Sequence, residues 1–373
     1  MDRTRGHYER DIMGREVRSE ELFVPGRLCL FGEHSDWAGG YRRIDKSVTP
    51  GYCIAVGTDQ GIYADVSPHP NEFIINSASM GGKTIGSQQF QMDEEELLKA
   101  AKGGGFFSYC AGVAYCILKE HQVWGLVIDN RMDLPIKRGL SSSASICVLT
   151  ARSFNQVYNL GLTRRQEMEY AYRGEILTSS ECGRMDQACA YGETPVFLTF
   201  DGDDMEIEEL SPHRPIYMVI ADLNKGKNTK KILSDLNYHF MKGNVYIRER
   251  LRYALGDANR EILMDAKRTL EQGDSARLGE LMNRGQRLFD ECVLPACSEE
   301  LAAPILHKVL SYPDIQDLIW GGKGVGSQGD GCVQFIARGL EEQEELMKRL
   351  WKLDVRPYNL IIKAFAPHVL KEE

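Results

Sequence analysis

The chain has 373 residues, of which 43% are apolar and 27% are charged, and it carries a formal net charge of −9. This length is enough for two domains with buried cores, and the composition is ordinary for a soluble globular enzyme. The negative charge argues against a nucleic-acid-binding surface, whose mark is a basic patch, but it does not exclude a local phosphate site.

The chain contains ten cysteines, and no two of them form a Cys-x-x-Cys pair. Most lie in apolar runs, as Cys147 and Cys332 do, which favours reduced buried thiols over zinc ligands or disulfides. The first twenty residues are dense in charge and lack an apolar core, which argues against a signal peptide. No window offers the ~20 apolar residues of a membrane span. We therefore expect a cytoplasmic protein with no membrane partner.

Short strand-like segments separated by Gly, Pro, Asn and Asp occupy residues 21–76 and predict an antiparallel or mixed sheet. A surface loop leading to a short helix is expected over the Gly-, Ser- and Gln-rich residues 77–105. Thr163 and Gln166 have the spacing of a helix capping box. In chain order we expect strands at 28–31, 52–56, 62–66 and 73–75, a helix around 106–117, a strand at 124–128, and helices from 141 to before 161 and from 164 to about 179.

The second half of the chain changes character and is dominated by helices. Its expected elements are strands at 195–200 and 216–221, helices at 230–239, 245–255, 261–272, 276–291 and 300–310, a Gly-rich loop at 321–331, a strand at 332–337, a helix at 341–353 and a strand at 359–365. This order is typical of an α+β sandwich. We place the boundary in the acidic stretch Asp201–Glu209, which gives domains 1–205 and 206–373.

Polar side chains follow directly after a predicted buried strand in the segment Pro25–Gly40. The strand is the apolar run Leu28–Phe31, and one base and two acids come after it. These three residues are Glu33, His34 and Asp36. Because proteins often place their chemistry where a strand ends, the cluster either grips a polyhydroxyl ligand or forms a solvated turn.

A Gly-containing loop leads straight into a predicted helix in the segment Pro135–Ala144, and the helix opens with Ser141, Ser142 and Ser143. The free N–H groups and the positive dipole end of such a helix make an anion site. The serine hydroxyls would add hydrogen bonds to phosphate oxygens or ligate Mg²⁺. The alternative is that the serines only cap the helix, and the spacing favours neither interpretation.

Two carboxylates, Glu175 and Asp186, flank the sequence Cys-Gly-Arg-Met-Asp-Gln at 182–187. Such a pair could divide its work, with one residue holding a metal and the other orienting or deprotonating a hydroxyl. Taken alone, two surface acids are the more common explanation.

Two glycine-rich sequences resemble nucleotide motifs and are rejected. Gly324–Gly329 contains G-x-G-x-x-G, but a strand is expected after it where a dinucleotide fold needs a helix. Gly82-Lys83-Thr84 resembles the end of a phosphate-binding P-loop, but that pattern needs Gly at position 77, where this chain has Ser77.

Four stretches in this order resemble the galactokinase, homoserine kinase, mevalonate kinase and phosphomevalonate kinase (GHMP) superfamily. Pro25–Gly40 is similar to the galactokinase signature, although Trp37 stands where that signature has Tyr. Pro135–Ala144 resembles the ATP motif, residues 182–187 resemble the segment with the catalytic aspartate, and residues 324–332 resemble the third, Gly-rich motif.

The resemblance implies an α+β, two-domain GHMP kinase fold with the active site in the cleft between the domains. The N-terminal domain would be a ribosomal-protein-S5-like mixed sheet with helices, and the C-terminal domain a ferredoxin-like α/β sandwich. The implied ligands are ATP, Mg²⁺ and a small-molecule sugar, in a monomer or homodimer.

The resemblance also implies a role for individual residues. Asp186 would orient or deprotonate the sugar hydroxyl, and Arg27 would offset the charge of the phosphoryl group. The phosphate-binding residues would be Lys137, Arg138, Gly139, Ser141, Ser142 and Ser143, the Mg²⁺ ligands Ser143 (or Ser142) and Glu175, and the sugar contacts Glu33, His34, Asp36 and Trp37.

The acidic residues after the predicted strand restrict which class of sugar we expect as the acceptor. A uronic acid would place its carboxylate near Glu33, and like charges repel in a partly desolvated site. We therefore expect a neutral sugar phosphorylated at its anomeric hydroxyl. The alternatives are a uronate kinase, a mevalonate-type kinase and a catalytically silent sugar sensor of galactokinase ancestry.

Overall fold

The computed structural model describes residues 8–10, 16–18, 21–133, 141–178, 180 and 182–365. The chain forms two compact units. The first unit contains residues 1–27 and 60–192, and the second contains residues 28–59 and 193–373. The long strands β3 (Leu22–Phe31) and β4 (Gly51–His69) belong partly to each unit.

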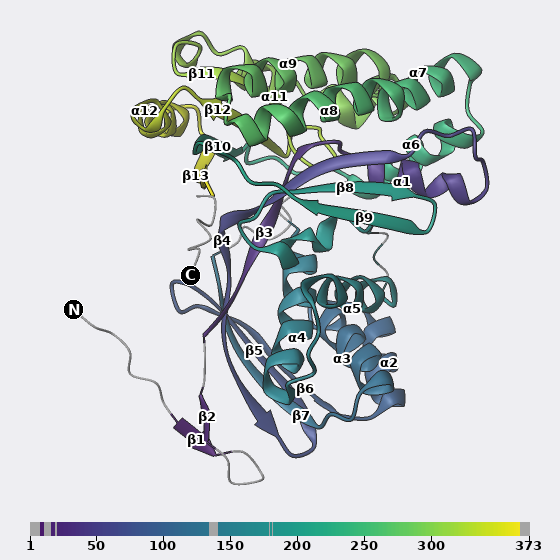
Figure 1. Ribbon diagram of the computed structural model, residues 1–373, viewed down its shortest axis with the longest axis vertical. Coiled ribbons are helices and arrows are strands. Elements are labelled where there is room, and N and C mark those ends of the chain that lie inside the picture. The colour runs from purple at the N-terminus through teal and green to yellow at the C-terminus, as the bar shows by residue number, and fades with distance from the viewer. Residues whose placement is uncertain are drawn as a thin grey trace, which may run out of the picture. The chain divides into compact units, whose positions relative to one another are not determined.

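The first unit packs helices against a mixed sheet. Its strands follow the order β6 (Thr84–Gln91), β5 (Glu72–Ser79), β7 (Gly125–Met132) and β4, and only the β5–β7 pair among them is parallel. Figure 1 shows the helices together on one side of these strands. The helices are α2 (Glu94–Gly103), α3 (Ser108–Glu120), α4 (Ser142–Tyr158) and α5 (Arg164–Ile176). The short strands β1 (Tyr8–Arg10) and β2 (Glu16–Arg18) pair antiparallel with each other. Phe73 of β5 and Phe154 of α4 are both fully buried, with ring centroids 5.5 Å apart, and join sheet to helices.

The second unit contains a four-stranded antiparallel sheet in the order β11 (Ile319–Gly324), β12 (Cys332–Ala337), β10 (Ile216–Asp222) and β13 (Arg356–Ile362). Helices α7, α8 and α9 run side by side in Figure 1. The helices of this unit are α1 (Ser35–Gly40), α6 (Thr229–Met241), α7 (Val245–Leu255), α8 (Asp257–Gln272), α9 (Ser275–Cys292), α10 (Ser298–Leu301), α11 (Pro304–Leu310) and α12 (Leu340–Trp351). β8 (Val196–Asp201) and β9 (Asp204–Glu209) form a hairpin, and the N-terminal part of β4 pairs with β8.

Most predicted elements are confirmed, and five predictions need correction. The segments expected at 52–56 and 62–66 are one strand, β4. Strands β6 and β11 occupy stretches predicted as loop, and the helix expected at 300–310 is two helices, the second of which starts at Pro304. The acidic stretch at 201–209, where we placed the domain boundary, is the end of β8 followed by β9.

The two compact units do not follow a single cut in the sequence. We predicted one boundary near residue 205, whereas residues 28–59 group with the C-terminal part of the chain and the later division falls between Gly192 and Glu193. The physical reason is that β4 is 19 residues long, so its two ends contribute to different cores. No helix in the described ranges has both the length and the apolar character needed to cross a membrane.

Candidate active site

Three residues far apart in the sequence meet in the first unit. The guanidinium of Arg27, in β3, is ion-paired with the carboxylate of Asp186 and donates a 2.6 Å hydrogen bond to the hydroxyl of Ser141. That hydroxyl in turn donates to the same Asp186 oxygen at 3.1 Å. Arg27 is 4% exposed and Asp186 is 26% exposed. A buried cation therefore holds a carboxylate that still reaches solvent.

Ser141 does not play the capping role that its position suggests. It stands just before α4 in the left-handed region (φ 54°), and its side chain makes no capping hydrogen bond because it is engaged with Arg27 and Asp186. The first N–H groups of α4, including those of Ser142 and Ser143, have no helical partner and lie at the positive end of the helix dipole. Lys137, Arg138 and Gly139 lie outside the described residues.

Glu175 is fully buried at the end of α5. Burial and the charge of Asp186 together raise the pKa of Glu175 from 4.5 to about 7, so the two carboxylates are close enough to interact. Hydrogen bonds from Ser143 and from Gln187, whose amide nitrogen lies 2.8 Å from Glu175 Oε2, oppose this rise in pKa. Ser143 and Glu175, predicted to share a metal ion, are therefore direct neighbours.

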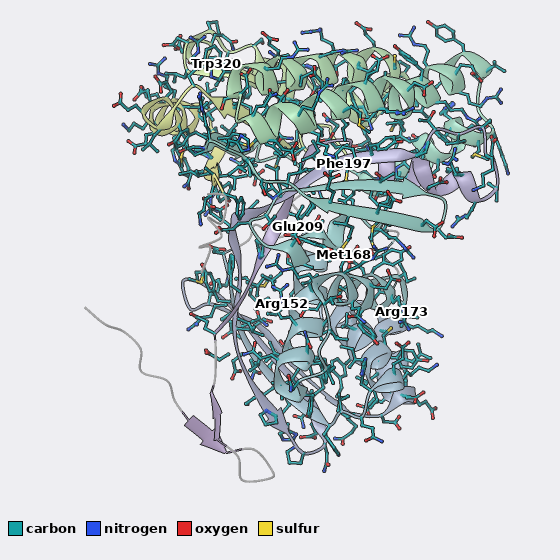
Figure 2. All side chains as sticks on the ribbon, in the orientation of Figure 1. Arg152, Met168, Arg173, Phe197, Glu209 and Trp320 are labelled. Carbon is teal, nitrogen blue, oxygen red and sulfur yellow. The ribbon has the colours of Figure 1, made fainter. Side chains whose placement is uncertain are left out.

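Arg152 ties together the segments that carry these residues. It projects from α4, as labelled in Figure 2, and its guanidinium donates to Glu167 of α5 at 2.9 Å. It also donates to the carbonyl oxygen of Phe23 in β3 at 3.3 Å and to that of Ala190 at 2.7 Å. Ala190 lies in the short helix η2 (Asp186–Tyr191). One buried network thus fixes β3, α4, α5 and η2 relative to one another.

The approach of α3 to α5 requires glycine on both helices. A Cβ at Gly112 would lie 2.2 Å from the carbonyl oxygen of Gly174, and a Cβ at Gly174 would lie 2.5 Å from the backbone nitrogen of Val113. Because Glu175 is the next residue after Gly174, this close contact sets the position of the buried carboxylate.

The described residues contain no group of three or more His, Cys, Asp or Glu side chains placed to hold a metal ion. A Mg²⁺ ion that arrives with a nucleotide needs only one or two carboxylates, because phosphate oxygens and water fill its other positions. Glu175 beside the Ser143 hydroxyl, with Asp186 nearby, meets that smaller requirement.

The second unit holds the other predicted site residues, which follow β3. Glu33 forms an ion pair with Lys323 of β11, and the side chains are 6% and 3% exposed, respectively. The Lys323 ammonium also donates to the carbonyl oxygen of Gly324 at 3.0 Å. Sequence reasoning missed this partner, although Lys323 borders the Gly-rich motif. The negative charge of Glu33 is therefore compensated by Lys323.

His34 and Trp37, which follow Glu33 closely in the sequence, form a hydrogen-bonded pair. Trp37 Nε1–H donates to His34 Nδ1 at 3.1 Å, and His34 stacks on Phe289 of α9 with ring centroids 6.1 Å apart. His34 is 4% exposed, whereas Asp36 is half-buried in the first turn of α1.

The Gly-rich motif joins strand β11 to strand β12. A dinucleotide-binding motif would be followed by a helix, so the observed order agrees with our rejection of that motif. Asp330 accepts hydrogen bonds at 2.9 Å from the backbone N–H groups of Ile305 and Leu306 and so caps α11. Gln328, with φ 63°, donates to the carbonyl oxygen of Gly324 at 3.2 Å. Asp330 thus ties the loop to α11, and Gln328 stabilises the loop itself.

Comparison with known proteins shows what this arrangement is similar to. Residues 108–193, which include α4, Glu175 and Asp186, match the sequence model of the GHMP kinases N terminal domain. The chain is 24% identical over 301 residues to galactokinase from Thermococcus kodakarensis, covering 74% of this chain and 80% of that protein. The chain therefore contains a segment that matches a GHMP kinase N terminal domain, and it is similar to galactokinases over most of its length.

Solved structures of kinases have the same fold as this chain. Lactococcus lactis galactokinase complexed with galactose has a TM-score of 0.68 at 18% identity, covering 92% of this chain and 94% of that one. L. major mevalonate kinase in complex with R-mevalonate has a TM-score of 0.68 at 18% identity, covering 93% and 97%. The predicted α+β GHMP kinase fold is confirmed, and its relatives indicate a kinase.

Proposed function

We propose that this protein is an ATP-dependent sugar kinase that transfers the γ-phosphoryl group of ATP to the anomeric hydroxyl of a sugar. The observation that carries the proposal is the cluster in which the buried Arg27 holds Asp186 beside Ser141, next to the N-terminus of α4. Phosphoryl transfer depends mainly on positioning and on charge stabilisation, and this cluster supplies a carboxylate, a cation and an anion-binding helix end.

In this proposal Asp186 orients and deprotonates the acceptor hydroxyl, because its carboxylate is partly exposed and already held in one orientation. Arg27 offsets the negative charge that develops on the transferring group. The start of α4, with Ser141, Ser142 and Ser143 and the preceding Lys137, Arg138 and Gly139, binds the phosphates. Ser143 and Glu175 would hold Mg²⁺, which neutralises charge on the phosphate oxygens.

The acceptor would be read in the second unit by Glu33, His34, Asp36 and Trp37. Galactokinase relatives support a neutral hexose or a derivative of one. The sequence argument against an acidic sugar rested on a free charge at Glu33, and the ion pair with Lys323 removes that basis. A uronate is therefore the second candidate.

A coupled ADP-release screen tests this proposal. The acceptors are galactose, N-acetylgalactosamine, glucuronate, arabinose, fucose, inositol and mevalonate. We expect ADP release that depends on one or more of the sugars, with a product that carries phosphate on the anomeric carbon. Turnover of mevalonate alone would overturn the sugar assignment. Absence of turnover with every acceptor, combined with a sugar-dependent rise in melting temperature, would identify a silent sugar sensor.

A further inference from the structure

Arg152 is a largely buried cation that the proposed chemistry does not use. It lies in α4 about three turns after Ser141, and its side chain is 20% exposed, while that of its partner Glu167 is 6% exposed. A buried ion pair adds little net stability compared with apolar residues of the same volume, because desolvation of both charges offsets their attraction. The stability of the fold alone therefore does not explain why this pair is present.

The guanidinium of Arg152 uses its three nitrogen atoms on three different segments. Nε donates to Glu167 of α5 at 2.9 Å, Nη1 to the carbonyl oxygen of Phe23 in β3 at 3.3 Å, and Nη2 to that of Ala190 in η2 at 2.7 Å. A planar guanidinium presents these donors in fixed directions, whereas the ammonium of lysine is one compact point. An arginine at this position therefore joins all three segments at once, and a lysine would not.

The short helix η2 is held by β3 at two separate points. Its first residue, Asp186, is ion-paired with Arg27 of that strand. Near its other end, Ala190 is joined through Arg152 to Phe23 of the same strand. A short segment that is held at one point can pivot about it, whereas a segment that is held at two points cannot. The direction in which Asp186 points is therefore set by both contacts.

Asp186 is the residue of η2 that reaches solvent. The other five residues of this helix are buried, whereas the side chain of Asp186 is 26% exposed. In the proposed reaction this carboxylate must face the acceptor hydroxyl, and an error of ~1 Å in such a position can cost about 10²-fold in rate. A contact that fixes η2 therefore bears on the rate, although it lies outside the cluster of Arg27, Ser141 and Asp186.

Glu167 orients the guanidinium of Arg152. One of its carboxylate oxygens accepts from Arg152, and the other accepts from the side-chain amide of Asn155 at 2.8 Å. Asn155 is itself bonded to Leu162, whose carbonyl oxygen accepts at 3.0 Å and whose N–H donates at 2.9 Å. Within the described part of the chain, the hydrogen bonds of Asn155 do not reach β3 or η2. Asn155 thus supports the same carboxylate without holding η2.

We propose that Arg152 is a positioning residue for Asp186: it joins the far end of η2 to β3, and so fixes the direction in which the carboxylate meets the acceptor hydroxyl. The inference rests on the proposed function for the role of Asp186. It assigns the pair of Arg152 and Glu167 to the geometry of the site, so that exchange of the pair for apolar residues lowers the rate more than the stability.

The test compares three variants of the full-length protein. Arg152→Lys keeps the charge and removes the planar fork. The double variant Arg152→Met with Glu167→Met replaces the pair with apolar residues of similar volume, so it leaves no buried charge unpaired. Asn155→Ala is the matched control, because it removes a hydrogen bond to Glu167 and leaves the contacts of Arg152 in place.

Two measurements are made on each variant. Acceptor-dependent ADP release, with galactose and with glucuronate, gives kcat and the KM for ATP. Hydrogen–deuterium exchange followed by mass spectrometry reports how often η2 opens, through the amides of Ala188 and Gly192, which donate to the carbonyl oxygens of Met185 and Cys189. The exchange measurement does not need turnover.

Both Arg152 variants should lower kcat about 10- to 100-fold, keep the KM for ATP within about threefold of wild type, and exchange the η2 amides about tenfold faster or more. Asn155→Ala should lower the melting temperature without either change. Wild-type kcat and wild-type exchange in the double variant would overturn the inference, as would an equal loss of kcat in Asn155→Ala.

The exchange measurement separates this inference from the proposed function. If the wild type phosphorylates neither sugar, the proposed function loses support. Faster exchange of η2 in the Arg152 variants would then still support the contact that fixes this helix, and exchange at the wild-type rate would still overturn it. Where Arg152→Lys fails to fold, the double variant decides the outcome.

Discussion

The guanidinium of Arg27 and the carboxylate of Asp186 form an ion pair in which the cation is buried and the anion is partly open to solvent. The two residues are 159 positions apart in the sequence, and the stretch between them includes most of the first unit. Arg27 is buried and contacts Asp186 from one side, so it holds the carboxylate without covering it. This asymmetry suits a carboxylate that must meet a substrate hydroxyl.

Replacing Arg27 with Met should lower kcat about 10²- to 10³-fold, because a preorganised charge is lost where negative charge develops. The dissociation constant for ATP, measured by calorimetry, should change only a few-fold. Arg42→Met is the matched control, since Arg42 is ion-paired with Asp201 within the second unit. A kcat within tenfold of wild type in Arg27→Met would remove Arg27 from the mechanism.

Glu175 should make the protein less stable as pH rises from 4.5 to 7. The unfolded chain loses this proton near pH 4.5, whereas the folded chain keeps it until about pH 7. The folded state therefore binds more protons in this window, and the free energy of unfolding falls with increasing pH. At ~1.36 kcal/mol per pKa unit, the loss is roughly 3 kcal/mol, and it levels off above pH 7.

Urea unfolding of the wild type and of Glu175→Gln at several pH values isolates this effect. The stability of wild type relative to Glu175→Gln should fall across the window. Glu120→Gln serves as control, because hydrogen bonds from Arg173 and Tyr170 lower the pKa of Glu120 to about 2, and its contribution is constant above pH 4.5. If the difference in free energy of unfolding between the wild type and Glu175→Gln does not depend on pH, the raised pKa assigned to Glu175 is contradicted.

Gly174→Ala should destabilise the first unit by about 1–3 kcal/mol, since the added methyl would lie 2.5 Å from the backbone of α3 and must force the helices apart. Activity should fall as well, because Glu175 is displaced. Gly103→Ala, at the open end of α2, has no atom within 4 Å of the new methyl and should leave the melting temperature nearly unchanged. Equal melting temperatures for the two variants would refute the close-packing argument.

The ion pair between Glu33 and Lys323 should behave as a coupled unit. Removing one partner of a buried pair typically costs about 3–5 kcal/mol, whereas replacing both with apolar residues of similar volume is often near neutral. Lys323→Met should therefore be strongly destabilised, and the double variant with Glu33→Leu should recover most of the loss. Additive effects in this double-mutant cycle would mean that the two side chains do not interact in solution.

Helical periodicity made much of the second unit predictable. The helix α7 has the bounds that its apolar spacing predicts, because one face of the helix must be buried. Strand β6 lacks such a signal, since Phe90 is its one buried side chain. Strand β11 was hidden by its glycines, which are needed because a Cβ at Gly321 would lie 2.1 Å from the carbonyl oxygen of Gly279 in α9.

The candidate site was predictable where a motif carries the chemistry within a short stretch. Arg27, Ser141 and Asp186 each belong to a recognisable segment, and the structure brings them together. The partner of Glu33 was not predictable, because Lys323 lies 290 residues away and no periodicity links the two. That single contact removes the basis of the charge argument against an acidic acceptor, which local sequence had supported.

The most direct test of the central claim is the rate of acceptor-dependent ADP release by the wild type and by Asp186→Asn, measured at saturating MgATP. Asp186→Asn keeps the size of the side chain and removes its negative charge. We predict sugar-dependent ADP release by the wild type, its loss in Asp186→Asn, and ATP binding that is largely intact in both. Full activity of Asp186→Asn would contradict the account.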